Sequence, residues 1–201
     1  MLSGGTSLAA LITLAMVPRL VGLRRRYDQA ALCPVPTPLP PLAAGVAVPG
    51  DLLAWAREGC GDGHVSMPWA EAQPPCPLAW RTVDATARNS LLALGYTLAG
   101  YPELDRRSPA QGKLYRLKVQ LWPLLWFARQ EGLPWDDGWL DAGQLDAARL
   151  EALARWRPRR ATLIVLDGLN AAQAGAVHQT LESQAPHYRQ PVRVLECGTG
   201  P

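Results

Sequence analysis

The stretch that most constrains the fold lies near the carboxyl terminus, between residues 160 and 197. Residues 161–166 form a short apolar run rich in β-branched side chains, which is typical of a strand covered on both faces. Asn170 and Gln173 follow with the spacing of a helix-capping pair. We therefore expect a strand and then a helix from about residue 171 to residue 184.

A second strand is predicted over residues 192–197, and the helix between the two strands is long enough for a crossover that makes them parallel. Two parallel strands need further strands and cover on both faces. The candidates within the chain are residues 79–83, 45–48 and 64–67; if none of them pairs, a partner subunit must supply the missing strands. The sequence thus predicts a small, helix-rich α/β (or α+β) domain.

Other helices are predicted from apolar periodicity and from capping patterns at Ser108–Gln111 and Asp141–Gln144. Their expected ranges are 50–58, 84 to about 100, 108 to about 130, and 141 to about 156. Tyr101 and Pro102 are expected to end the second of these helices. Residues 132–139 are rich in Gly, Pro, Asp and Trp, and we expect a loop there.

The amino terminus carries an apolar run, residues 2–23, with one charged residue, and three arginines at 24–26 follow it. About 20 apolar residues suffice to cross a bilayer as a helix. We therefore expect a membrane-embedded helix whose carboxyl side faces the cytoplasm, because arginines accumulate on that side. The alternatives are a helix packed on the folded domain and a cleaved signal, which fits less well because the charge follows the apolar run.

Proline dominates the next segment, with six prolines between residues 33 and 49. Such a segment cannot sustain a helix and favours an extended spacer, although it also resembles a docking peptide for an aromatic-lined groove. The predicted organisation is an apolar helix over 1–27, a proline-rich spacer over 28–49 and an α/β domain over 50–201.

Size and charge narrow the function classes. At 201 residues the chain holds one domain with appended sequence, and its 48% apolar content suits a folded core. A net charge of +3 is too small to indicate a nucleic-acid surface, so we do not expect nucleic acid as a partner. Four cysteines are too few and too dispersed for a disulfide scaffold.

The best candidate binding site follows the first carboxyl-terminal strand, at Asp167, Gly168 and Asn170. Ligands of parallel sheets bind at the carboxyl ends of the strands, but Asp-Gly is also an ordinary turn dipeptide. Asp136 and Asp137, in the predicted loop, are further ligand-binding candidates for a sugar or a cation, with a solvated turn as the alternative.

No metal site and no cofactor are expected. Cys60, His64 and Cys76 supply three ligands in no recognised order, and whether the two cysteines pair stays open. The chain also lacks a nucleophile elbow, a dinucleotide fingerprint and a phosphate-binding loop. These absences favour a protein without catalytic activity.

We therefore expect a non-catalytic, membrane-tethered accessory or protein-interaction component of a larger assembly, with its folded domain in the cytoplasm and proteins as its partners. The first alternative is a small α/β enzyme or nucleotide-binding domain with its site near Asp167. The second is a soluble cytoplasmic subunit whose residues 2–23 are buried against a neighbour.

Overall fold

A computed structural model describes residues 27–35, 46–58, 78–108, 110–115, 134–188 and 190–198. The chain divides into two compact units. The larger unit comprises residues 27–61, 75–106 and 134–201 and contains the whole sheet.

The smaller unit comprises residues 1–26, 62–74 and 107–133, of which only 107, 108 and 110–115 are described. Ser108 and Gln111 form the predicted capping pair there: the Ser108 N–H donates to Gln111 Oε1 at 3.2 Å, and the Gln111 N–H donates to Ser108 Oγ at 3.4 Å. Residues 110–115 are helical. The predicted start of this helix is therefore confirmed, and its continuation to residue 130 lies outside the described residues.

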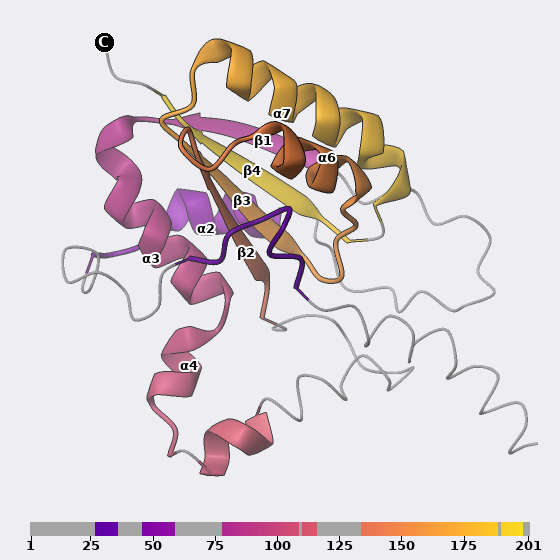
Figure 1. Ribbon diagram of the computed structural model, residues 1–201. Helices are drawn as coiled ribbons and strands as arrows, with labels where there is room; N and C mark the ends of the chain where they lie inside the picture. Colours follow the sequence, from indigo (N-terminus) through magenta and orange to yellow (C-terminus); the bar gives the residue numbers. More distant parts are fainter. Residues whose placement is uncertain are drawn as a thin grey trace, which may run out of the picture. The chain divides into compact units, whose positions relative to one another are not determined.

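A four-stranded sheet forms the centre of the larger unit, in the order β1-β4-β3-β2 with every neighbouring pair parallel (Figure 1). The strands are β1 (Leu78–Val83), β2 (Asp136–Asp141), β3 (Thr162–Asp167) and β4 (Val192–Cys197). The predicted strand–helix–strand unit is β3, α7 (Ala171–Gln184) and β4, and the predicted strand at 79–83 is β1. The α/β class is confirmed.

Helices cover both faces of this sheet. One face packs against α6 (Ala147–Arg155) and α7, which connect β2 to β3 and β3 to β4 (Figure 1). The other packs against α2 (Gly50–Arg57) and α3 (Arg88–Leu98). The remaining elements are the short helices η1 (Ala85–Ala87), α4 (Tyr101–Asp105) and η3 (Ala185–His187).

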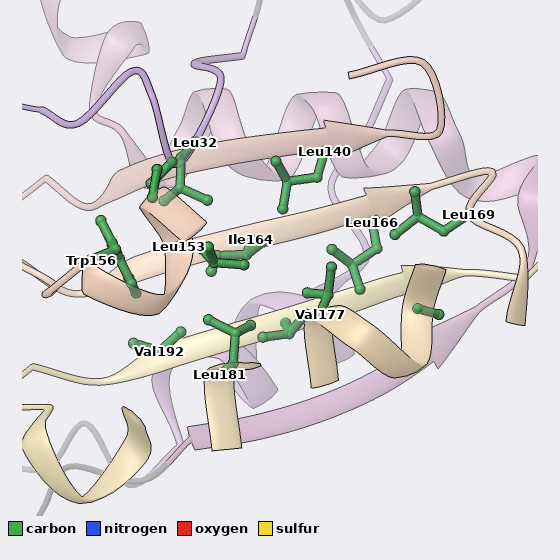
Figure 2. Close-up of a cluster of buried hydrophobic side chains, with 14 of the residues drawn as sticks. Leu32, Leu140, Leu153, Trp156, Ile164, Leu166, Leu169, Val177, Leu181 and Val192 are labelled. Carbon is green, nitrogen blue, oxygen red and sulfur yellow. The ribbon is translucent and has the colours of Figure 1, made fainter. Parts of the chain in front are cut away.

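The two hydrophobic cores follow from the alternation of side chains along the strands. Ile164 and Leu166 of β3 point to the α6–α7 side, where they meet Leu153, Val177 and Leu181 (Figure 2). The alternate β3 residues belong to the core on the α2–α3 side. A strand buried on both faces is a nearly continuous apolar run, and residues 161–166 show such a run in the sequence, with Thr162 as the buried polar exception.

Helix boundaries differ from the predicted ones at three places, and the first is the helix predicted from residue 84, which begins with η1 and continues as α3 from Arg88. Asp141 does not cap α6; it ends β2, its side chain accepts the N–H of Gln144 at 2.9 Å, and Asp146 caps the helix by accepting from Arg149 N at 2.7 Å. Beyond α3, Gly100 adopts a left-handed conformation with φ 76°, and α4 then begins at Tyr101. The predicted stop at Tyr101–Pro102 is therefore a change of helix direction.

The predicted loop at residues 132–139 is wrong in its second half, because Asp136–Asp141 is the edge strand β2. Asp136 and Asp137 are buried there, with 9% and 7% of their surface exposed. A polar Asp-Asp-Gly sequence carries no strand signal, but this one is accommodated because both carboxylates find hydrogen-bond donors in the folded chain.

Residues 27–35, hereafter the strap, lie against β2 although most of them fall within the predicted spacer. Ala31 and Leu32 join the core on the α6–α7 side, and Val35 joins the core on the α2–α3 side. The strap therefore passes around the outer edge of β2, and its residues belong to the folded body.

The remaining predicted segments are the candidate strand at 45–48 and several stretches that the structure does not describe. Residues 46–48 are not a strand. The candidate strand at 64–67, most of the proline-rich segment (36–45) and the apolar run 2–23 lie outside the described residues. In the part of the chain that is described, no helix combines the length and apolar character that a membrane crossing requires.

Candidate functional site

Asp167 lies at the carboxyl end of β3, where the sequence places the best site. Its Oδ2 accepts the Nε–H of Arg88 at 2.7 Å, which joins β3 to the first turn of α3. The Arg88 side chain is 60% exposed, against 19% for Asp167, and its guanidinium carbon lies 5.7 Å from the ring centre of Trp139. The candidate carboxylate thus has a cation partner that the sequence analysis did not identify.

Gly168 and Asn170 serve the turn and the helix that follow. Gly168 has φ 64°, in the left-handed region that favours glycine. The Asn170 side chain accepts the Gln173 N–H at 2.9 Å, and the Gln173 side chain accepts the Asn170 N–H at 3.1 Å. The predicted capping box is confirmed, so the Asn170 side chain is engaged in starting α7.

Asp136 and Asp137 lie at the opposite end of the sheet. In the parallel register Asp136 is beside Thr162, whereas Asp167 is beside Asp141, five residues farther along β2. At about 3.3 Å per residue this separation is roughly 16 Å. The five candidate residues therefore occupy two places, and they do not form one site.

Asp136 is held by a two-pronged ion pair with Arg159. The Nε–H donates to Oδ2 at 2.7 Å and an Nη2–H donates to Oδ1 at 2.9 Å. This geometry is the strongest form of carboxylate–guanidinium contact, and it raises the pKa of Arg159. The Asp136 carboxylate is therefore already paired with Arg159, which lies in the loop before β3.

Asp137 is bonded by the strap instead. The Val35 N–H donates to its Oδ2 at 2.6 Å, and the Tyr27 hydroxyl donates to its backbone oxygen at 2.5 Å. Burial raises the pKa of Asp137 to about 6, and the charge of Asp136 adds to the rise, while the Val35 N–H opposes it. Burial and the charge of Asp137 also raise the pKa of Tyr27.

A third polar group, at Trp80, His178 and Glu196, was not recognised from the sequence. The ring of His178 in α7 stacks on Trp80 of β1 with 3.5 Å between centroids and 12° between planes. Its Nε2 lies 3.6 Å from Oε2 of Glu196 in β4. Only the strand register could have indicated this cluster, because the three residues are far apart along the chain.

The described residues contain no group of three or more His, Cys, Asp or Glu side chains arranged to hold a metal ion. Cys33 and Cys197 are free thiols, and burial raises the pKa of Cys197 to about 11, with Asp167 adding to the rise. Cys60, His64 and Cys76 lie outside the described residues. Comparison with protein-family models, curated proteins and solved structures finds no match for this chain.

Proposed function

We propose that the chain is a non-catalytic interaction component of a larger assembly, and that residues 2–23 attach it to a membrane with the folded domain in the cytoplasm. The observation that carries the interaction part is the contrast between the two edges of the sheet. The strap covers the outer edge of β2, whereas none of the described residues pairs with the outer edge of β1.

The outer edge of β1 has the chemistry of a strand-pairing surface. The Val83 carbonyl accepts the Gly198 N–H at 2.9 Å on the β4 side, so the backbone groups of Trp80 and Thr82 face outward by alternation. Aromatic and β-branched residues favour strand pairing, and an exposed edge offers a row of donors and acceptors. A partner with an extended segment fits this edge by strand addition.

The structural roles of the candidate site residues support the non-catalytic part of the proposal. Asp136 binds Arg159, Asp167 binds Arg88, and Asn170 caps α7. Each of these side chains already has a structural partner within the domain. A catalytic acid or base needs a group that can exchange its proton with a substrate.

The test of the interaction is a pair of variants at one edge position. Thr82→Pro removes an outward N–H without removing a bond to β4, and proline is tolerated on the open side of an edge strand. We expect tagged full-length Thr82→Pro to lose the proteins that cross-link and co-purify with the wild type, while Thr82→Ala retains them. Equal recovery with both variants, or no partner with the wild type, would contradict the proposal.

The membrane part is tested separately by extraction with alkaline carbonate. Wild-type chain should stay with membranes, and Leu11→Arg with Leu14→Arg should release it, because each charge at bilayer depth costs a few kcal/mol. A truncated control must begin at Tyr27 and not at Gly50, because a start at Gly50 deletes the buried strap residues Ala31, Leu32 and Val35. Release of the wild type by carbonate would refute integral attachment.

One observation supports a second candidate function, nucleotide binding. Arg88 is mostly exposed at the carboxyl edge of the sheet, where nucleotides bind in parallel α/β folds. Calorimetric titration with nucleotides, using wild type and Arg88→Met, tests this alternative. Saturable binding that Arg88→Met abolishes would favour the nucleotide-binding function over the proposed one.

A further inference from the structure

The strap closes one edge of the sheet through a small number of polar contacts. The Trp139 N–H donates to the Cys33 oxygen at 2.6 Å, and these two residues form an isolated antiparallel bridge. An Nη1–H of Arg149, in α6, donates to Cys33 Sγ at 2.9 Å. The middle of the strap is thus attached to both β2 and α6.

Both ends of the strap meet at a single residue, Asp137. The Tyr27 hydroxyl binds its backbone oxygen, and the Val35 N–H binds its carboxylate. Between these two bonds, Leu32 packs over Gly138 so closely that a Cβ at position 138 would lie 2.9 Å from Leu32 Cδ2. The strap and the first half of β2 therefore form one packed layer centred on Asp137.

The surroundings of the Asp137 carboxyl make its charge unfavourable when the strap is closed. Asp136 of β2 adds a second negative charge, although Arg159, from the loop before β3, binds it. The strap contributes the titratable groups Tyr27 and Cys33, and α6 contributes Arg149, which binds the Cys33 sulfur. Two backbone donors stabilise the carboxylate: the Val35 N–H of the strap and the N–H of Asp137 itself.

We propose that the strap is a proton-controlled cover for the outer edge of β2, which closes more firmly when the Asp137 carboxyl is protonated. A protonated carboxyl keeps an oxygen that accepts the Val35 N–H, and it removes the buried charge. Opening would free the backbone of β2 around Trp139 and uncover parts of both cores, because strap residues belong to each. The domain would then present a second edge for strand addition.

The direction of the effect follows from linkage. With the strap closed the pKa of Asp137 is about 6, and with the strap open the carboxyl is exposed and its pKa should approach the ordinary value of 3.8. The closed form therefore binds the proton more tightly, so its advantage is complete below pH 3.8 and is lost as the pH rises through 6. Between pH 5 and pH 7.5 the closed-to-open ratio should fall about tenfold.

Amide hydrogen exchange on the full-length protein measures this ratio. Protection of the Val35 and Trp139 amides, corrected for the intrinsic pH dependence of exchange, should fall about tenfold from pH 5 to pH 7.5. The β3 amides report on unfolding of the whole domain, which also exposes Asp137. They should stay more strongly protected than the strap amides at both pH values, because the strap opens without unfolding of the domain. Corrected strap protection that does not change between pH 5 and pH 7.5, or that equals β3 protection at both pH values, would overturn the proposal.

Two variants assign the effect to one carboxyl. Asp137→Asn keeps an oxygen acceptor for the Val35 N–H and carries no charge, so strap protection should be high at both pH values. Asp28→Asn alters an exposed carboxyl in the same strap, which accepts local N–H groups, and should leave the wild-type pH dependence intact. Persistence of the pH dependence in Asp137→Asn refutes the assignment. If this variant does not fold, the pH dependence of strap protection in the wild type still decides.

Discussion

Replacing Gly138 with alanine tests the placement of the strap most directly. A Cβ at this position would lie 2.9, 3.0 and 3.1 Å from Cδ2, Cδ1 and Cβ of Leu32, whereas carbon atoms prefer separations of about 3.5–4.0 Å. Leu32 is 1% exposed, so its side chain has no solvent to move into. The substitution must displace the strap or distort β2.

The size of the effect combines two opposing contributions. Overpacking a filled core costs about 1–3 kcal/mol, and replacing glycine with alanine returns about 0.4–1 kcal/mol by restricting the unfolded chain. We expect Gly138→Ala to lower the free energy of unfolding by about 1–2 kcal/mol. For a chain of this length the Tm should fall by roughly 2–8 °C.

A double-mutant cycle separates the clash from other effects. Leu32→Ala alone should cost about 2–4 kcal/mol, because it empties a buried volume. Combined with Gly138→Ala it should cost less than the sum by about 1 kcal/mol, because both Cδ atoms of the clash are gone. Urea denaturation of the four proteins, followed by circular dichroism, gives all the required values.

Gly175→Ala is the matched control, since Gly175 lies in the exposed part of α7 and a Cβ there would meet no atom within 4 Å. This control should raise stability by about 0.5–1 kcal/mol, because alanine favours the helix interior. If Gly138→Ala stabilises the protein to the same degree, Leu32 does not lie over Gly138 and the account of the strap is wrong.

Three further stability predictions follow from buried or stacked side chains, all measured by urea denaturation. Arg159→Met should lower the free energy of unfolding by about 3 kcal/mol, because it leaves the buried Asp136 carboxylate without its partner. Arg88→Met should lower it by under about 1 kcal/mol, because this arginine is exposed. Equal losses would contradict the difference in burial. His178→Ala should lower the free energy of unfolding by about 1 kcal/mol, because it removes the stacking on Trp80. His187→Ala, at an exposed residue, is the control and should leave stability unchanged. Unchanged stability in His178→Ala would refute the stacking. Tyr188→Phe should leave the free energy of unfolding unchanged or raise it by up to about 1 kcal/mol, because the buried hydroxyl has no hydrogen-bond partner among the described residues. A large loss of stability would reveal a partner.

Local signals were sufficient for the elements whose determinants lie next to one another in the chain. The capping box of Asn170 and Gln173, the start of a helix after Ser108 and the strand at β3 all depend on residues within a few positions. Asp141 is the exception, because an equally good capping pattern ends a strand there. Asp141 is the last residue of β2 and accepts the Gln144 N–H, and Asp146 caps the helix in its place.

Candidate site residues were harder to predict, because their roles depend on partners that are distant in sequence. Asp136 and Asp137 resemble a solvated loop until Arg159 and Val35 are placed beside them. Asp167 was correctly placed at the carboxyl end of a strand, but its partner Arg88 is 79 residues away. His178 had no visible carboxylate partner until the sheet order brought Glu196 under α7.

The sequence by itself determined the α/β class, the parallel unit from β3 to β4 and the start of α7, because apolar alternation and capping act over a few residues. Only the tertiary structure decided that two aspartates form an edge strand, that the strap encloses it and that Trp80 stacks on His178. These outcomes depend on the burial of charge and on side-chain contacts between remote segments. A polar residue can be buried once its partner is in place, and no local pattern specifies that partner.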